Sequence, residues 1–445
     1  MQNILVLGAG HAAPYLIHRL LERAEERSWK ITVADRDREA ARRRVGDHPR
    51  GRAESLDLQD AAARAELVRL ADVVVDLLPP ALQPLVAQDC LRHRCPLVSA
   101  SYLDPRVRGL DGEARERDVL LLAELGLDPG IDLVSAAHLL NRARSAGGRV
   151  LSFESYGAGL PSRPDVNPLT YCVTWNPRNV VMAGAQGAQY LHGGRLHLVP
   201  WWRVFRETWT VEVPGLGELE AYANRSSLDY QRSLGLDDVE TLVRGTLRYP
   251  PWIAAWDLVV RLGMPNEGLR IPDLPERTWA ELTSSFLPRG SGPTDVEKGV
   301  RSHLGLPAAS REMEALRWLG LFRNRRIDGD VQTPAEALVR LLTERLRLPS
   351  GVPDRVLLHH RLVVDLPGGR TEEWLSTFVE DGDPEGFTAM ARTVGLPAAL
   401  GAELLLDRKL GVPGCRTPAD PELFPILRDA LEAAGIRFRE ERRPL

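Results

Sequence analysis

Residues 3–13 read NILVLGAGHAA, an apolar run that ends in Gly8-Ala9-Gly10 and leads into a helical pattern. The spacing Gly8-x-Gly10-x-x-Ala13 is the fingerprint of dinucleotide-binding folds. The first glycine permits a tight turn, the second lets a pyrophosphate approach the backbone, and the third position packs the helix on the strand. The first turn of such a helix offers free N–H groups to phosphates. We therefore expect residues 1–125 to form a Rossmann domain.

A second apolar run ends in Asp35, at the distance from the fingerprint where these folds contact the adenosine ribose. A carboxylate there accepts hydrogen bonds from the ribose of NAD and repels the 2′-phosphate of NADP. Arg36 follows at once and is either a partner for that phosphate or a solvated surface arginine. The sequence thus favours NAD and leaves NADP open. The residues expected to contact the cofactor are Gly8, Gly10, His11, Ala12, Asp35, Arg36, Asp57, Leu58, Leu78 and Pro79.

The apolar pattern divides the rest of the chain. Further apolar runs at 72–78, 96–100 and 119–122 continue a strand–helix alternation, which indicates a doubly wound parallel sheet. Short strands between Gly- and Pro-rich turns, among them 171–175, indicate a second domain that is rich in antiparallel strands. We expect that domain over 126–233 and 347–385, a helical insert domain over 234–346, and a C-terminal return to the Rossmann domain over about 386–445.

Composition limits the function classes. The net charge of −4 over 445 residues gives no reason to expect nucleic acid as a partner, and we expect no membrane span or signal peptide. Four cysteines without a CxxC or zinc spacing favour a reducing, cytoplasmic compartment and no metal site. Only Lys30, Lys298 and Lys409 are lysines, which disfavours a lysine general base.

Several longer segments carry a family resemblance. They are LAELGLDPGIDLVSA at 122–136, SYGAGLPSRPDVNPLTYCVTWNPRNVVM at 155–182, YANRSSLDY at 222–230 and RGTLRYP at 244–250. In this order, and over essentially the whole chain, they resemble the saccharopine dehydrogenase (L-glutamate-forming) family. The resemblance implies an α/β protein with a Rossmann domain, an α/β substrate domain with a mixed sheet and an inserted helical domain. It also implies a homodimeric oxidoreductase of lysine metabolism. Its NAD(P)-dependent reaction is the reversible reduction of the imine between glutamate and 2-aminoadipate 6-semialdehyde to saccharopine.

The resemblance also implies site residues. Asp128 and Tyr102 are expected to be catalytic, through a water that relays protons. The expected substrate carries three carboxylates, and the forked guanidinium groups of Arg225 and Arg244 suit carboxylates. Simpler structural roles are a helix cap near Ile131 for Asp128, a core position for Tyr102 and surface ion pairs for the arginines. The substrate-binding residues implied are Ser101, Tyr102, Asp128, Gly157, Asn224, Arg225, Arg244 and Thr246.

Departures from the family pattern keep other enzymes open. Gly157 stands where the family has a cysteine, Ala223 replaces a proline, and Asp35 stands where NADP-using members often have cysteine. Alternatives are a related opine, carboxynorspermidine or lysine 6-dehydrogenase acting on another amine, or a non-catalytic NAD-binding scaffold. The sequence leaves open the physiological amine, the direction of the reaction and the choice between NAD and NADP.

Overall fold

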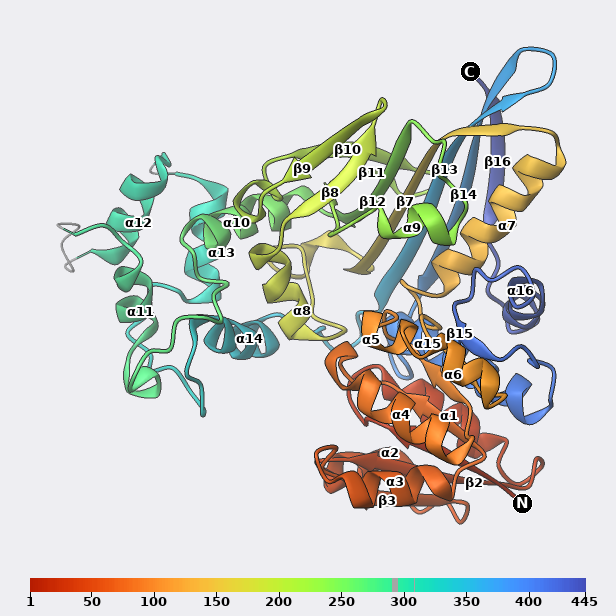
Figure 1. Ribbon diagram of the computed structural model, residues 1–445. Helices are drawn as coiled ribbons and strands as arrows, with labels where there is room; N and C mark the ends of the chain where they lie inside the picture. Colours follow the sequence, from red (N-terminus) through yellow and green to blue (C-terminus); the bar gives the residue numbers. More distant parts are fainter. Residues whose placement is uncertain (290–294, 308) are drawn as a thin grey trace. The chain divides into compact units, whose positions relative to one another are not determined.

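The computed structural model describes residues 1–289, 295–307 and 309–445. The chain forms two compact units (Figure 1). The first comprises Met1–Val150, Ser233–Leu236 and Val363–Leu445, and the second comprises Leu151–Arg232 and Asp237–Leu362. The division into a Rossmann domain, a substrate domain and a helical insert remains a prediction from the sequence.

The first unit contains a seven-stranded sheet in the order β15-β6-β5-β4-β1-β2-β3. Every neighbouring pair in it is parallel. The order reverses beside β1, which makes the edge at β1 and β4 the switch point where doubly wound folds bind ligands. The predicted doubly wound sheet is therefore confirmed. Its strands are β1 (Gln2–Leu7), β2 (Trp29–Asp35), β3 (Gly51–Ser55), β4 (Val73–Asp76), β5 (Leu97–Ser99), β6 (Leu120–Leu122) and β15 (Gly414–Arg416).

Continuous apolar runs explain why these strands lie inside the unit. All four residues of β4 are buried, as expected for a parallel strand covered on both faces. In α1 (Ala13–Glu22), apolar residues at helical spacing face inward. The other helices of the unit are α2 (Arg38–Val45), α3 (Ala61–Arg69), α4 (Gln83–His93), α5 (Pro105–Arg108), α6 (Asp111–Glu116), α7 (Ile131–Ser145), α15 (Ala389–Leu406) and α16 (Phe424–Ala433).

Two elements of the C-terminal segment, α15 and β15, pack on or pair with elements of the Rossmann sheet's unit. Gly395 of α15 lies so close to α1 that a Cβ there would stand 2.9 Å from the Leu16 nitrogen, and β15 pairs with β6. By length and composition α15 could also cross a membrane, but 78% of it is buried in the fold, as in the core helix of a globular protein. The final strand behaves differently, because β16 (Arg439–Pro444) pairs with β14 (Arg370–Asp381) and not with the Rossmann sheet.

The second unit contains a mixed sheet whose strands follow the order β10-β11-β12-β7-β13, and β8 pairs with β12 on one side and with β9 on the other. The pair β12–β7 is parallel, whereas β10–β11 and β11–β12 are antiparallel. The predicted strand at 171–175 is wrong: the segment is irregular, and the Tyr171 side chain is buried beneath Trp252 instead. The strands are β7 (Arg149–Pro161), β8 (Ala188–His192), β9 (Arg195–Val199), β10 (Thr208–Val213), β11 (Gly217–Ala223), β12 (Thr241–Arg248) and β13 (Asp354–Leu366).

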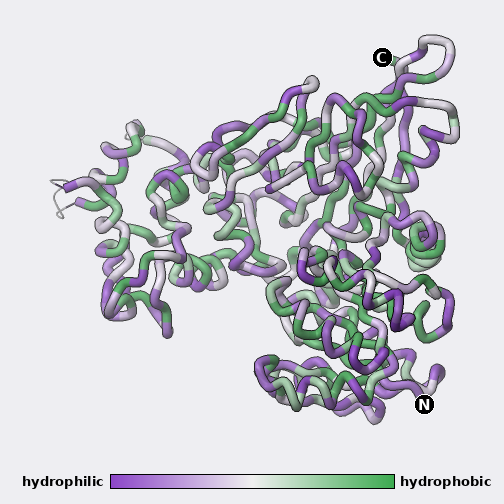
Figure 2. Tube along the Cα trace, in the orientation of Figure 1, coloured by the Kyte–Doolittle hydropathy of each residue, from purple (hydrophilic) through white to green (hydrophobic). Residues whose placement is uncertain are grey.

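Helices complete the second unit. Hydrophobic and hydrophilic residues alternate along them in Figure 2, as in amphipathic helices that share a core. That core includes the stacked pair Trp252–Trp256, whose ring centroids are 4.8 Å apart. The helices are α8 (Pro177–Met182), α9 (Asp229–Ser233), α10 (Pro250–Arg261), α11 (Trp279–Ser285), α12 (Val296–Leu304), α13 (Arg311–Leu319) and α14 (Pro334–Arg345).

Candidate active site

The glycine fingerprint forms the turn between β1 and α1. Gly8 has a φ of +101° and donates its N–H to the Ala34 carbonyl at 2.9 Å. A Cβ on Gly8 would stand 3.4 Å from the Leu77 carbonyl oxygen, whereas a Cβ on Gly10 would enter open space. The open space above Gly10 leaves room for a pyrophosphate against the backbone, at the N-terminal end of α1. The residues present therefore fit a dinucleotide.

The end of β2 is tied to this turn through Asp35. Its carboxylate accepts a hydrogen bond from the Ala9 N–H at 2.8 Å and another from the Asp37 N–H at 2.9 Å. Asp35 therefore has a structural task at the glycine turn that the sequence did not reveal. Arg36 is exposed and has no hydrogen-bond or ion-pair partner among the described residues, so its guanidinium is available to an anion.

A second guanidinium lies beside the glycine turn. The Arg44 Nε donates to the Ala9 carbonyl at 3.4 Å. Partial burial, followed by the charge of Arg43, lowers the pKa of Arg44. The run Arg42–Arg44 on α2 was the only sequence signal for it, and such a run usually marks a solvated face.

The other expected cofactor residues follow the carboxyl ends of the strands. The Asp57 carboxylate accepts a hydrogen bond from the Gln59 N–H at 2.9 Å, and the Leu58 carbonyl accepts one from the Arg64 guanidinium. Leu78 and Pro79 follow β4, while His11 and Ala12 lie between the glycines and α1. The structure thus places the predicted cofactor set at the carboxyl ends of β1 to β4, where a doubly wound sheet binds its dinucleotide.

The two predicted catalytic side chains contact each other. The Tyr102 hydroxyl donates to the Asp128 carboxylate at 3.3 Å, and both residues are half-buried. The alternative of a core tyrosine is therefore wrong. Asp128 does not cap α7 either, because the cap residue is Gly130, whose N–H donates to Asp132 at 2.6 Å. Ser101, the neighbour of Tyr102, donates its hydroxyl to the Leu78 carbonyl at 2.8 Å.

Asp76 is a residue of this edge that sequence reasoning missed. It ends β4 and is fully buried, and burial raises the pKa of its carboxyl group to about 7. Hydrogen bonds from the Leu78 N–H and the Ser99 hydroxyl oppose that rise. An acid that ends an apolar run was the available signal, as it was for Asp35.

In the second unit, adjacent strands align four of the predicted substrate residues. Thr246 of β12 is in register with Gly157 of β7, and the Asn224 N–H donates to the Arg244 carbonyl at 2.9 Å. Arg244 is only 3% exposed, and its guanidinium carbon lies 4.1 Å from the centre of the Tyr230 ring. The surface ion pair considered for Arg244 is therefore wrong, because this cation lies inside the unit against an aromatic face.

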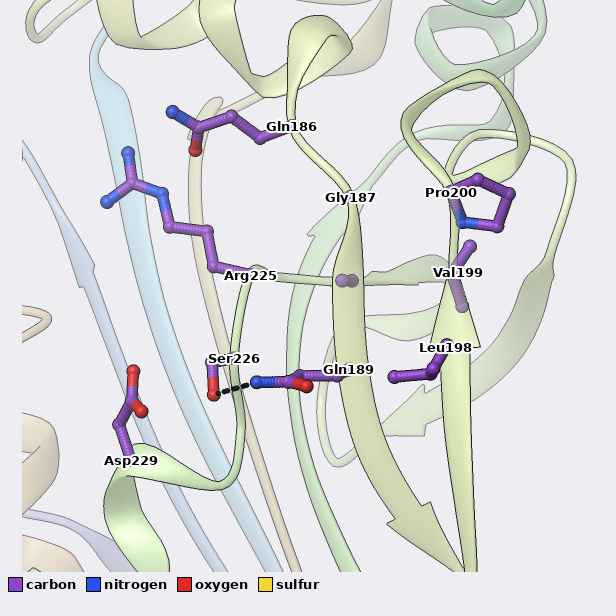
Figure 3. Close-up of a pocket in the computed structure, with 10 residues that line it drawn as sticks. Gln186, Gly187, Gln189, Leu198, Val199, Pro200, Arg225, Ser226 and Asp229 are labelled. Atoms are coloured by element: carbon purple, nitrogen blue, oxygen red, sulfur yellow. Dashed lines mark hydrogen bonds between the residues drawn. The ribbon is translucent and has the colours of Figure 1, made fainter.

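Arg225 lines a hollow of about 510 Å³ in the second unit. Its φ of +54° lets β11 end abruptly, and its carbonyl accepts the Gln189 N–H at 2.8 Å. Figure 3 shows the side chains of Gln186, Arg225 and Asp229 on one side of β8, the strand that carries Gln189. Guanidinium, amide and carboxylate groups together suit a ligand that carries both a carboxylate and an amine.

The histidine pair on β13 has packing contacts in the core. His359 stacks on Tyr156 and His360 on Phe153, with centroids 6.4 and 5.7 Å apart. Both histidines are buried. Within the described ranges no group of three or more His, Cys, Asp or Glu side chains could hold a metal ion.

Comparison with known proteins identifies the family. The saccharopine dehydrogenase NADP binding domain matches residues 4–122, and the saccharopine dehydrogenase C-terminal domain matches residues 126–436. The chain is 30% identical to the saccharopine dehydrogenase [NADP(+), L-glutamate-forming] of Schizosaccharomyces pombe, over 99% of each chain. It is 33% identical to the mitochondrial alpha-aminoadipic semialdehyde synthase of Bos taurus and spans about half (47%) of that protein's length.

A solved structure supports the same family assignment. The apo saccharopine dehydrogenase (L-Glu forming) of Saccharomyces cerevisiae superimposes with a TM-score of 0.86 at 28% identity, covering 100% of both chains. The match extends over both units and includes the segments that carry the predicted site residues. The chain therefore belongs to the saccharopine dehydrogenase family of oxidoreductases.

Proposed function

We propose that this protein catalyses the reversible oxidation of saccharopine. In that reaction saccharopine, NADP⁺ and water give glutamate, 2-aminoadipate 6-semialdehyde, NADPH and a proton. The match to the fission-yeast dehydrogenase over 99% of both chains is the observation that carries this proposal. The glycine turn, the Tyr102–Asp128 pair and the Arg225 hollow supply groups that the reaction needs.

For the cofactor we propose NADP, in place of the NAD that Asp35 led us to expect. The matching N-terminal domain is an NADP binding domain, and the fungal relatives are named for NADP(+). Two local observations support this choice. The Asp35 carboxylate is already engaged by the Ala9 and Asp37 N–H groups, and Arg36 is exposed without a partner. A free guanidinium next to the ribose-binding carboxylate suits a 2′-phosphate.

The bound nicotinamide supplies the hydride acceptor, while the chain's own residues bind the substrate and move protons. We assign Arg225 to a substrate carboxylate, because an exposed guanidinium in a concave site forms bidentate, charge-assisted hydrogen bonds. Arg244 is buried, so we assign it to fixing the ends of β11 and β12 around Asn224 and Thr246. This assignment leaves direct contact between Arg244 and substrate as the less favoured alternative.

We assign the proton transfers to Asp128 and Tyr102. Oxidation of the secondary amine requires that its proton be removed, and hydrolysis of the resulting imine requires an activated water. Asp128 accepts the Tyr102 hydroxyl proton in a hydrogen bond of 3.3 Å, so the two groups form a short relay. We propose Asp128 as the general base and Tyr102 as the residue that orients it.

The homodimer and the reducing compartment also remain part of the proposal. All four cysteines are free thiols, which agrees with a reducing compartment. Light scattering on the purified protein tests the dimer.

The decisive experiment is a substrate screen followed at the nicotinamide absorbance band. Saccharopine, an opine, lysine and carboxynorspermidine are each supplied with NADP⁺ and with NAD⁺. We expect saccharopine with NADP⁺ to give the highest kcat/KM, and the Arg225→Ala variant to lose that preference. Faster turnover of another amine would mean that the protein catalyses a different reaction. Cofactor binding without any turnover would support a non-catalytic scaffold.

A further inference from the structure

A closed set of hydrogen bonds joins the two loops that follow β4 and β5. The Asp76 carboxylate accepts the Leu78 N–H at 2.9 Å and the Ser99 hydroxyl at 3.1 Å. The Ser101 N–H donates to the Ser99 oxygen at 3.3 Å, and the Ser101 hydroxyl donates to the Leu78 carbonyl at 2.8 Å. We call Asp76, Leu78, Ser99 and Ser101 the Asp76 network.

Gln83 extends this network and fixes the direction of its hydrogen bonds. The Gln83 amide nitrogen donates to the Ser99 hydroxyl at 3.0 Å, and its amide oxygen accepts the Asp104 N–H at 3.0 Å. The Ser99 oxygen thus accepts two hydrogen bonds, and its own proton points to Asp76. Asp76 must act as an acceptor on both oxygens, which is the pattern of an ionised carboxylate.

The network lies under residues that the proposed reaction uses. Leu78 belongs to the expected cofactor set, and Ser101 precedes Tyr102, the partner of Asp128. Asp76, Gln83 and Ser99 are each 0% exposed, so water cannot replace a lost hydrogen bond among them.

We propose that Asp76 is a positioning residue, whose ionised carboxylate orders the 77–80 and 99–104 loops for cofactor binding and for presentation of Tyr102. This inference rests on the proposed function only in what the ordered loops serve. The ordering itself is a property of the protein without ligand.

The surroundings of Asp76 make its ionisation state sensitive to pH. Burial raises the pKa of Asp76 to about 7, against the two hydrogen bonds that lower it. From α4, the titratable group facing it is the Cys90 thiol, whose own pKa is raised by burial first and by Asp76 among later causes. On α15, Glu403 is paired with Arg19 and Arg392 with Glu380, so these charges have other partners. Protonation of Asp76 would leave its new O–H without an acceptor in the network.

The test uses the cofactor-free full-length protein and two variants. Asp76→Asn places an amide nitrogen against one of the two donors, which breaks the network without changing size. Glu403→Gln is the matched control, since it neutralises a second buried acid of the same unit that lies outside the network. Hydrogen exchange of peptides covering 97–104, corrected for the intrinsic rate, is measured between about pH 6 and about pH 8.

Local opening of the two loops would keep Asp76 buried and remove the two hydrogen bonds that lower its pKa, so this opening, unlike global unfolding, becomes harder as Asp76 ionises. We expect protection of 97–104 in the wild type to fall about tenfold as the pH decreases across this range, following the ionised fraction of one group. Asp76→Asn should show low protection at every pH, and Glu403→Gln should follow the wild type. Protection that is constant with pH in the wild type, or a wild-type profile in Asp76→Asn, would overturn the proposal.

A titration with NADPH, followed by its fluorescence, provides the second readout. The Kd of the wild type should rise at low pH, and Asp76→Asn should bind up to about tenfold more weakly than the wild type at about pH 8. The 2′-phosphate titrates near pH 6 and affects all three proteins alike, so the difference between their profiles is the measured quantity. If exchange responds as expected but saccharopine is not oxidised, the proposed reaction fails while the role of Asp76 stands.

Discussion

Replacing Asp76 by asparagine should make the first unit gain stability relative to the wild type as pH rises from about 4 to about 7, although it breaks hydrogen bonds. The carboxyl group is fully buried, and its pKa rises from 3.8 to about 7 on folding. A shift of about three units corresponds to about 4 kcal/mol, as an upper bound, because one unit is worth about 1.4 kcal/mol.

The sign of the pH dependence follows from the raised pKa. Between the unfolded pKa of 3.8 and the folded pKa of about 7, the unfolded chain releases the Asp76 proton while the folded chain retains it. The free energy of unfolding of the wild type therefore decreases as pH rises through this window. Asparagine has no charge to bury, so the stability of the variant relative to the wild type should increase by up to about 4 kcal/mol over the same window.

Urea denaturation at closely spaced pH values, monitored by circular dichroism, measures this difference. Contributions from all other titrating groups cancel when the two proteins are compared at each pH. Ser99→Ala provides a further check, since it removes a hydrogen bond that lowers the pKa of Asp76 and should move the upper end of the window to higher pH. A difference between Asp76→Asn and the wild type that is constant, or that decreases with pH, would refute the reasoning. The variant thus gains stability relative to the wild type with rising pH, and it is less well ordered for its cofactor.

Other substitutions address the remaining parts of the site. Gly10→Ala should change the free energy of unfolding by no more than about 1 kcal/mol, because its Cβ enters open space, yet it should lose NADPH binding. Gly8→Ala should lower the free energy of unfolding by about 1–3 kcal/mol, because φ at this residue is +101°. Thermal unfolding and NADPH fluorescence separate the two variants, and tight NADPH binding by Gly10→Ala would argue against the pyrophosphate site. Arg225→Ala should raise the KM for saccharopine about 10- to 100-fold, which corresponds to the loss of one charge-assisted hydrogen bond, and should leave the Kd for NADPH unchanged. An unaltered KM in steady-state kinetics would show that Arg225 does not bind the substrate. Arg36→Ala should weaken NADPH about tenfold and NADH little, as measured by titration with each; equal losses for both would exclude a role with the 2′-phosphate. Asp128→Ala should lower kcat by about 10²- to 10⁴-fold, the usual contribution of a general base, and unchanged turnover would end that assignment.

Local sequence patterns were sufficient for the Rossmann sheet. Gly8, Gly10 and Asp35 are separated by a strand–helix–strand unit whose geometry leaves few alternatives, so the turn, the helix and the ribose-side carboxylate follow from spacing.

Tertiary contacts determined what the patterns could not. The segment 171–175 alternates like a strand, but Tyr171 packs on Trp252, which is far away in the chain. Asp128 precedes a helix as a cap would, yet the cap is Gly130. The Asp76 network was hidden because it joins residues from two strand ends, and only the parallel register of β4 with β5 places Asp76 beside Ser99.

The most direct test of the account measures two of the products of saccharopine oxidation, NADPH and glutamate, in one reaction. Purified protein is incubated with saccharopine and NADP⁺, and NADPH and glutamate are quantified over time, with Arg225→Ala and Asp128→Ala run in parallel. We expect NADPH and glutamate to appear mole for mole with the wild type and to form far more slowly with either variant. Folded wild-type protein that binds NADPH but forms neither product would contradict the account.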